Sequence, residues 1–311
     1  KRRCPATPTQ RRNGRLRQGG AMATPPLLPS WQAPMKTGAR RRTELLDCTD
    51  VPTHQKIPFI LCGYRPPPQG PLGLLKTMFT LHNETGNIWT HLLGAVYFAG
   101  LGVQLCGDLM RAEQHHAPLE VLVVLALVLA SDFCLVSSFV YHLCRCASHG
   151  VCQCTYKLDL SGIVVLIGAS YFCGIALGFR CAPALRLFWL VYAALVIAAL
   201  AAPLLFPGLM EDHTCHFIAC VALGLAPAAH YVYISDVEEV QVILPYLLGM
   251  FGCYGIGAWF FVQKLPERLW PGRFDLLGHS HQVWHVFVVL AAMSWCQGMI
   301  RLLEHFANRE C

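Results

Sequence analysis

The last long apolar run of this 311-residue chain opens with Gly278-His279-Ser280-His281-Gln282-Val283-Trp284-His285-Val286-Phe287-Val288-Val289-Leu290. His281 and His285 stand four residues apart, a spacing that places both imidazoles one turn apart on the same face of a helix. Polar rings are costly to bury in lipid, so a pair of them on an apolar helix is expected to face the protein interior. The stretch therefore predicts two metal ligands at the start of a membrane-spanning helix.

The composition places this helix in a membrane protein. The chain is 55% hydrophobic and 14% charged, with a mean hydropathy of +0.45, whereas soluble globular chains carry about 25% charged residues. The predicted spans are 88–106, 119–143, 159–179, 185–206, 215–235, 239–263 and 281–303. They are long enough to cross a bilayer and their connections are short, so we expect an all-α, seven-transmembrane helix bundle forming one domain over 87–305. The fifth span is interrupted by Pro227, His230 and Tyr233.

The regions outside this domain are polar. Residues 1–45 form a basic segment without a periodic apolar pattern, and we expect a disordered cytosolic tail that fixes topology or touches anionic lipid rather than nucleic acid. Residues 46–86 are expected to be cytosolic or interfacial, with a short interfacial helix over 72–79. Residues 306–311 would be a short C-terminal tail. The chain does not begin with Met, and Met22 and Met35 are candidate start positions.

The basic residues near the span ends predict the orientation. With a cytosolic N-terminus the inner side collects the basic tail and Lys56, Arg65, Lys76, Arg145, Lys157, Lys264, Arg268 and Arg273. The outer side then collects Arg111, Arg180, Arg186, Arg301 and Arg309. The excess of positive charge on cytosolic loops predicts that the N-terminus is cytosolic and the C-terminus is outside or lumenal.

This orientation places further polar residues at the depth of the histidine pair. The second span ends inside at His142, with Ser138 one turn earlier, and the third begins inside at Asp159. Three neutral imidazoles around an open fourth position form a catalytic type of zinc site, in which the metal lowers the pKa of a bound water. In this prediction His142, His281 and His285 bind Zn²⁺, Asp159 is a general base, and Ser138 orients the water or a substrate carbonyl.

Other polar residues receive structural interpretations. His279 is expected just outside the span and solvated, and His91 is expected to anchor the membrane interface together with Trp89 rather than to bind metal. Glu267 and Arg268 are expected to have a structural role in the loop before the last span. The scattered cysteines predict no disulfide framework. Three alternatives remain open for one cysteine group, which are reduced thiols, a structural zinc site and palmitoylation. Its members are Cys144, Cys146, Cys152 and Cys154.

These motifs, taken in order over roughly 58–305, resemble the progestin and adipoQ receptor family, which includes adiponectin receptors and bacterial haemolysin-III-like proteins. The matching pieces are Gly63-Tyr64-Arg65, Asn83-Glu84-Thr85-Gly86-Asn87-Ile88-Trp89-Thr90-His91, Ser138-x3-His142, Leu158-Asp159-x2-Gly162-Ile163, Pro266-Glu267-Arg268-x2-Pro271-Gly272 and Ser280-His281-Gln282-x2-His285. The resemblance implies a seven-helix bundle with an intramembrane zinc on the same three histidines, and Asp159 reaching that zinc through water. Within the family, the segment from Asn83 to His91 resembles the adiponectin receptors, and Gly278-His279-Ser280-His281 resembles the progestin-type members. The short N-terminal region, Tyr141-His142-Leu143 and the chain end resemble the Golgi branch that tethers Raf kinase, which is the branch we favour.

The resemblance implies a zinc-containing receptor, possessing in the adiponectin branch an activity that hydrolyses ceramide to sphingosine and a fatty acid. The expected partners are membrane lipids including a ceramide-like substrate, an extracellular protein or steroid ligand, and a cytosolic signalling partner at the N-terminal region. A membrane scaffold with a structural zinc is the alternative. A transporter is disfavoured because the outer halves of the spans hold few ionisable groups. Either function requires a multi-pass protein of the plasma membrane or the Golgi.

Overall fold

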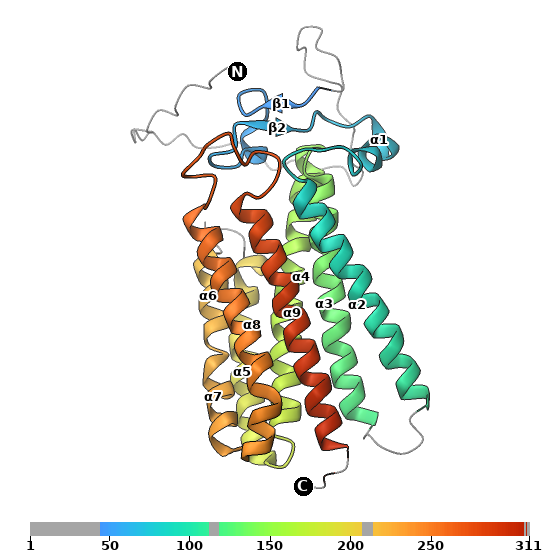
Figure 1. Ribbon diagram of the computed structural model, residues 1–311, viewed down its shortest axis with the longest axis vertical. Coiled ribbons are helices and arrows are strands. Elements are labelled where there is room, and N and C mark those ends of the chain that lie inside the picture. The colour runs from blue at the N-terminus through green and yellow to red at the C-terminus, as the bar shows by residue number, and fades with distance from the viewer. Residues whose placement is uncertain (1–43, 112–117, 207–213, 308, 310–311) are drawn as a thin grey trace.

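The computed structural model describes residues 44–111, 118–206, 214–307 and 309. Within these ranges seven helical segments are long and apolar enough to cross a membrane, which confirms the predicted fold class (Figure 1). The spanning helices are α2 (Thr85–Arg111), α3 (Pro118–Cys144), α4 (His149–Gly178), α5 (Pro183–Leu205), α6 (Thr214–Ala222) with α7 (Leu225–Ile234), α8 (Val237–Gln263) and α9 (Ser280–Phe306). The predicted basic tail 1–45 lies almost wholly outside the described residues.

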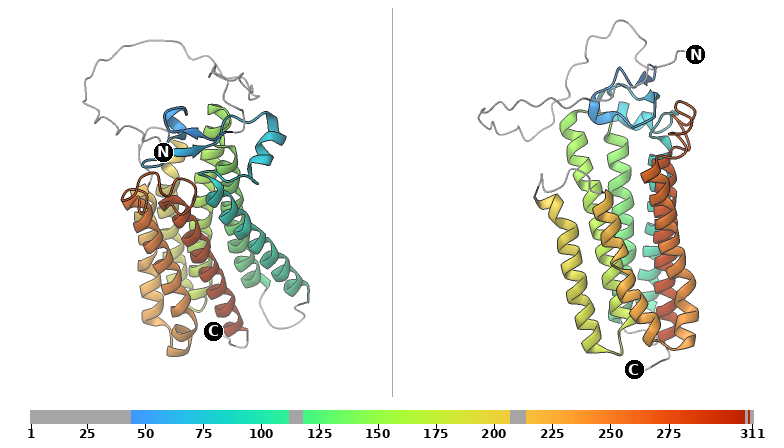
Figure 2. Two further views of the ribbon diagram at one scale, coloured as in Figure 1. Left: turned by 45° about the horizontal axis from the view of Figure 1, so that its top comes forward. Right: turned by 90° about the vertical axis from the view of Figure 1, so that its left-hand side faces the viewer.

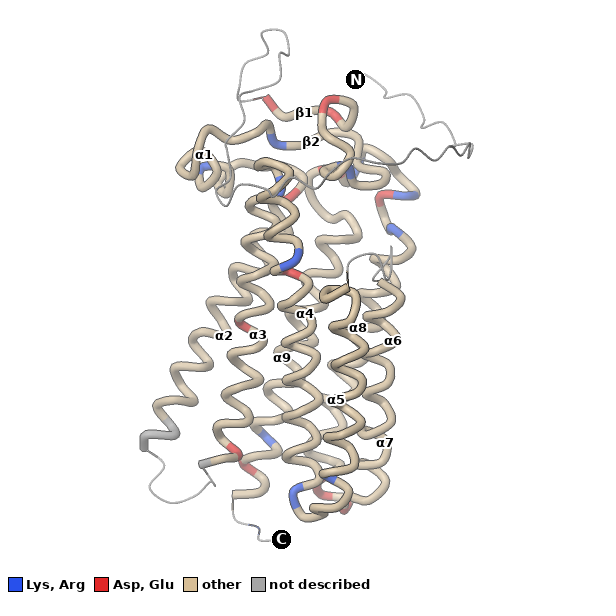
Figure 3. The backbone as a smooth tube through the Cα atoms, turned by 180° about the vertical axis from the view of Figure 1, so that it is seen from behind, with Lys and Arg blue, Asp and Glu red and all other residues tan. Residues whose placement is uncertain are grey.

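Helices α3 and α9 occupy the interior of the bundle. In the most apolar segment of α3, and likewise of α9, half of the residues are buried within the protein. In the fifth span only 17% are buried. The charged residues gather toward the two ends of the bundle and few lie along the helices (Figure 3). The other side chains at the bundle surface are largely apolar, as lipid contact requires. Side chains on the inner faces of α3 and α9 are therefore shielded from both lipid and water.

The fifth span is broken in two at residues 223–224, whereas Pro227, His230 and Tyr233, which were expected to interrupt it, lie within α7. Helix α6 ends at Ala222 and α7 begins at Leu225, so that Pro227 lies in the first turn of α7. Proline is tolerated there because the first N–H groups of a helix have no intrahelical partner. The Tyr171 hydroxyl of α4 donates to the carbonyl of Cys220 at 2.8 Å, near the end of α6. The neighbouring helix α4 therefore supplies a hydrogen bond to one of the backbone carbonyls that the break leaves without a partner in its own helix.

A small polar cap covers one end of the bundle (Figures 1 and 2). It contains the antiparallel pair β1 (Leu46–Asp47) and β2 (Cys62–Tyr64), the 3-10 turn η1 (Thr53–Gln55) and helix α1 (Gly70–Thr77). Val51, Ile60 and Tyr64 form its own buried core. The Cys62 N–H donates to the Asp275 carboxylate at 2.8 Å, which joins the cap to the loop between α8 and α9. The cap thus encloses the end of the bundle at which α2 and α9 begin.

One disulfide lies at the end of the bundle away from the cap. Cys181, between α4 and α5 at that end, is disulfide-bonded. Among the described residues at the cap end, Cys144, Cys146 and Cys154 carry reduced thiols. Disulfides persist in oxidising compartments and cytosolic thiols stay reduced. The orientation itself remains a prediction, and this arrangement suits a cap that faces the cytosol.

Helices α3 and α4 approach each other closely through Gly162. A Cβ atom added at Gly162 would lie 2.9 Å from the Cys134 Cα and 3.3 Å from the Ser137 Cβ. A backbone atom cannot move aside, so we expect Gly162→Ala to separate the helices and destabilise the protein by about 1–3 kcal/mol. Thermal unfolding in detergent measures the loss. Gly100→Ala is the matched control, since nothing lies within 4 Å of its Cβ position, and an equal loss there would contradict this prediction.

Candidate metal centre

Three histidines converge beneath the cap. His142 lies in the last turn of α3, while His281 and His285 lie in the first two turns of α9. One ring nitrogen from each lies within 4.8 Å of the other two, and within the described residues these three side chains form the single group able to hold a metal ion. His142 and His285 are 0% and 3% exposed. The two helices predicted from sequence to supply ligands are therefore in contact, and the three predicted ligands meet.

The donor set fits a small divalent metal. The His142 and His281 Nε2 atoms are 3.3 Å apart, close to the separation of about 3.3 Å between two ligands that each lie about 2.05 Å from a tetrahedral ion. The buried Nδ1 of His285 has no hydrogen-bond partner. Buried polar atoms without partners are rare in folded proteins and indicate an unfilled role. Three imidazoles with available nitrogen atoms at this spacing can together bind a metal ion.

Glu84 fixes the orientation of His142, and it was not predicted as a site residue. Its Oε2 atom lies 2.8 Å from the His142 Nδ1. A carboxylate only accepts, so Nδ1 carries the proton and the Nε2 lone pair is directed toward His281. A carboxylate behind a histidine ligand in this way sets its tautomer and raises its basicity. A signal for this role exists in the sequence, because Glu84 is an acid at the start of an apolar span, at the predicted depth of His142.

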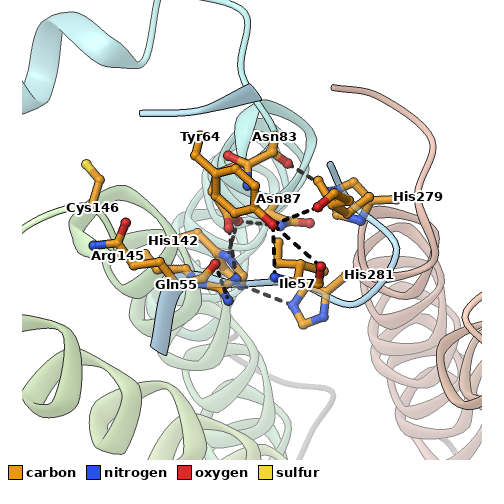
Figure 4. A network of polar contacts seen from close by, with 12 residues as sticks. Gln55, Ile57, Tyr64, Asn83, Asn87, His142, Arg145, Cys146, His279 and His281 are labelled. Atoms are coloured by element: carbon orange, nitrogen blue, oxygen red, sulfur yellow. Dashed lines mark hydrogen bonds and ion pairs between the residues drawn. The ribbon is translucent and has the colours of Figure 1, made fainter. Parts of the chain in front are cut away.

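The charge on Glu84 is stabilised by three neighbours, and Figure 4 shows these three, Asn87, His142 and Arg145, gathered in one network. Arg145 Nη1 donates to Oε1 at 2.8 Å, and the Asn87 amide donates to Oε2 at 2.6 Å. Burial alone would raise the pKa of Glu84, but Arg145 and the hydrogen bonds from His142 and Asn87 hold it well below the ordinary value. Glu84 is thus an anion buried beside the cluster, and its ion pair with Arg145 is half-buried.

The start of α9 is held by a second buried carboxylate. Glu267, which is 0% exposed, accepts hydrogen bonds from the Ser280 N–H at 2.7 Å and from the Ser280 hydroxyl. A negative charge at a helix N-terminus is favoured by the helix dipole and satisfies a free N–H group. Glu267 therefore positions the first turn of α9, directly before His281. Glu267 was expected to have a structural role in the loop, and the structure shows that this role is to cap the start of α9.

The prediction for His279 was wrong. His279 is 0% exposed, and its Nε2 atom lies 2.9 Å from the Asn83 carbonyl. The Gln282 amide also donates to this carbonyl, at 3.0 Å. The residues around Asn83 fold back over the start of α9 and exclude water from it, which no local sequence pattern indicated. Burial lowers the pKa of His279 from its ordinary value, and a neutral ring can donate through Nε2.

The prediction for His91 as an interfacial anchor was also wrong. His91 is 4% exposed, and its ring stacks on that of His285 with 3.7 Å between the ring centroids. Helix α2 is packed against α9 here, so the residue points inward rather than toward the headgroups. His91 lies outside the group of potential metal ligands. It supports one face of the His285 ring and limits the rotation of that ring.

Asp159 and Ser138 lie together next to the histidines. The Ser138 hydroxyl lies near the Asp159 carboxyl, and Asp159 interacts electrostatically with His142. Ser138 is buried and Asp159 is half-buried. Packing of α3 on α4 brings them together, as the shared depth of the spans predicted. The structure places a carboxylate at the edge of the histidine cluster, close to one hydroxyl group.

The cysteines near the end of α3 do not form a metal site in the described part of the chain. Cys144, Cys146, Cys152 and Cys154 are free thiols, and none belongs to the group of potential ligands. Cys146 and Cys152 are buried while Cys154 is exposed. Burial raises the pKa of the Cys146 thiol, which disfavours the thiolate form that binds metals.

Comparisons with known proteins agree with this architecture. The haemolysin-III-related family matches residues 79–296. The chain is 30% identical to "Heptahelical transmembrane protein 1" of Arabidopsis thaliana, covering 85% of this chain and 82% of that protein. It is 28% identical to "Progestin and adipoQ receptor family member 3" of Homo sapiens, covering 82% and 84%.

A fly protein gives a match over less of its own length. The chain is 30% identical to the "Adiponectin receptor protein" of Drosophila melanogaster over 78% of this chain, and spans 55% of that protein. The family match covers α2 to most of α9 and includes all three histidines. The chain belongs to the haemolysin-III-related family of multi-pass membrane proteins, together with adiponectin and progestin receptor-like proteins.

Proposed function

We propose that the chain is a zinc-containing receptor of the adiponectin and progestin type, and that it signals by hydrolysing ceramide-like lipid amides. The observation that carries the proposal is the buried meeting of His142, His281 and His285 beside the Asp159 carboxyl. Three imidazole ligands are typical of catalytic zinc sites, which retain an open position. The ligand set, the metal and the reaction are proposals supported by this geometry and by the family.

Zinc, when bound at such a site, supplies a Lewis acid that polarises a carbonyl and lowers the pKa of a coordinated water to about 7. The protein's own groups perform the remaining tasks. Glu84 holds the proton on the His142 Nδ1 atom, so that Nε2 remains a ligand. Asp159 accepts a proton from the attacking water and delivers it to the departing amine, while Ser138, close to the Asp159 carboxyl, orients the water or the substrate carbonyl. The cap excludes bulk water from this end of the bundle.

A membrane scaffold with a structural zinc is the second candidate, and one observation favours it. The described part of the bundle contains an apolar cavity lined by α4, α7, α8 and α9, with Tyr171, Tyr231, Leu247 and Trp295 among its walls. Its volume is about 90 Å³, below the roughly 300–1,000 Å³ of typical ligand pockets. A long acyl chain therefore requires the helices to separate, whereas a scaffold requires no such cavity. A Golgi tether for a cytosolic kinase is this kind of function.

Asp159→Asn separates the two functions. For the hydrolase, we expect bound zinc to remain near one equivalent while sphingosine release from ceramide falls by at least about 100-fold, since a general base contributes about 10²–10⁴-fold. Purified protein in lipid nanodiscs allows both measurements. Asp132→Asn, a carboxyl change in α3 outside the cluster, is the matched control and should retain activity. Zinc-loaded wild type without hydrolysis would favour the scaffold, and wild type that binds no zinc would contradict both.

A further inference from the structure

Helix α1 has one face against the protein and one without a protein partner. Leu74 is 7% exposed and packs in a small cluster with Ile88 and Leu143 at the ends of α2 and α3. On the other face Leu72 is 74% exposed and Phe79, just beyond the helix, is 78% exposed. Leu75 is 48% exposed between them. Leu72, Leu75 and Phe79 form what we call the outer face of α1, spaced as one stripe of a helix.

The outer face is continuous with the lipid-facing surface of the bundle. Phe79 contacts Trp89 of α2 edge to face, with 6.0 Å between the ring centroids. Four and seven residues after Trp89, Leu93 and Val96 are 62% and 64% exposed on the same side of this spanning helix. Exposed apolar side chains of a spanning helix contact lipid. Figures 1 and 2 show α1 projecting to the side of the bundle at the end where α2 begins.

Two side chains give this region the chemistry of a membrane interface. Lys76 is exposed within the stripe of the outer face, between Leu72 and Phe79. A lysine in this position extends its amine toward lipid phosphates while its stem covers apolar surface. The Trp89 indole donates to the Met78 carbonyl at 2.9 Å, and tryptophan is enriched at the headgroup level. A water-soluble protein partner could not cover this surface, because the surface continues along the lipid-facing side of α2.

We propose that the outer face of α1 inserts into the headgroup boundary of the bilayer leaflet at the cap end, and that this contact holds the metal centre in place. The second part rests on the proposed zinc site, whereas the first does not. The occupant is the phospholipid surface, with the apolar side chains among the acyl chains and Lys76 at the phosphates.

The connection from α1 to the histidines is short. Arg65 donates from Nη1 to the Thr77 hydroxyl at 2.8 Å, and from Nη2 to the His142 carbonyl at 2.6 Å. Thr77 is the last residue of α1, so one guanidinium joins the end of the interfacial helix to the backbone of a metal ligand. His82 adds a second connection, since its Nε2 donates to the Thr77 carbonyl at 3.1 Å and its Nδ1 accepts from the Glu84 N–H at 3.1 Å. Movement of α1 is thereby transmitted to both His142 and Glu84.

Site-specific photocrosslinking tests the membrane contact. The full chain carries a benzophenone amino acid at position 72 or 79 and is reconstituted in nanodiscs of phosphatidylcholine and phosphatidylserine. We expect an added phospholipid mass after irradiation at both positions, and none at Lys56, an exposed site within the cap. The lipid adducts should persist in His281→Ala protein, which makes this outcome independent of zinc. A crosslink to a second copy of the chain, or no lipid adduct at either position, would overturn the proposal.

A double-mutant cycle tests the connection to the metal centre. Leu72→Ser with Phe79→Ser should weaken zinc binding in nanodiscs by about 10-fold, the effect typical of disturbing groups behind metal ligands. Leu93→Ser on the lipid face of α2 is the matched control and should leave zinc affinity unchanged. In protein that combines Arg65→Gln with His82→Ala, which removes both connections, the same pair of serine substitutions should cause little further loss. Additive losses would show that α1 acts through neither Arg65 nor His82 and would overturn this part.

Discussion

Protein in which His281→Ala and His285→Ala are combined is expected to bind no zinc and to lose the thermal stabilisation that zinc gives the wild type. Both residues lie in the first turns of α9, and their ring nitrogens face His142 of α3. A metal held at 1,000 times its dissociation constant stabilises a fold by about 4 kcal/mol. This corresponds to a melting shift on the order of 10 °C for a chain of this size. Metal analysis and thermal unfolding, with and without chelator, measure both effects.

His305→Ala is the control for this experiment, because it lies in the last turn of the same helix and is outside the cluster. It should retain one equivalent of zinc and the full response to chelator. The same comparison distinguishes binding from folding, since the doubly substituted protein should melt near the temperature of chelated wild type. Stoichiometric zinc in the double variant, or a wild type whose melting is unaffected by chelator, would contradict the assignment.

Glu84→Gln is expected to have the second-largest effect, and to act on two properties at once. The amide keeps the shape of the carboxylate but removes the negative charge. That charge strengthens the hydrogen bond that Glu84 Oε2 accepts from the His142 Nδ1–H at 2.8 Å. Loss of a carboxylate behind a histidine ligand lowers metal affinity by about 10–100-fold. Arg145 would also lose its counter-ion. Its side chain is 14% exposed, so we expect a cost of about 1–3 kcal/mol, less than for a fully buried pair. Zinc titration and thermal unfolding report the two effects separately.

The two effects can be separated by a second substitution. Adding Arg145→Met to Glu84→Gln removes the unpaired charge, so stability should recover in part while zinc affinity stays low. The ion pair between Arg180 and Glu120, 3.2 Å apart at the other end of the bundle, provides a matched control. Glu120→Gln should cost about 1 kcal/mol or less and leave zinc affinity unchanged, because this pair is partly exposed. Unchanged zinc affinity in Glu84→Gln would remove Glu84 from the site.

The ligand histidines were predictable because each lies at the end of a long apolar run. Hydropathy fixed the number of spans, and the spacing of His281 and His285 fixed a shared helical face. The alternation of span direction then placed His142 at the same depth. Each span crosses the bilayer in a known direction. The position of a residue along its span therefore gives its depth in the membrane, and this can be read from the sequence alone.

The contacts made by the residues around the ligands were not predictable in this way, although depth alone places Glu84 near His142. The Glu84 contact with His142 joins positions separated by 58 residues, and the His279 contact with Asn83 joins positions separated by 196 residues. Both contacts depend on how the cap folds over the end of the bundle. The cap lies outside the spans, so the direction of the spans does not determine its fold. Local polarity suggested solvation for His279 and an interface for His91. The residues around Asn83 bury His279, and packing of α2 against α9 buries His91.

The sequence by itself determined the class of protein, the seven spans, and the three histidines with Asp159 and Ser138 at one depth. The tertiary structure alone decided which side chains orient those ligands, namely Glu84 behind His142 and Glu267 at the start of α9. The physical reason is that depth follows from hydrophobicity along the chain. Lateral placement and hydrogen-bond partners follow from packing between distant segments, where a buried charge must find its counter-charge or donors wherever the fold supplies them.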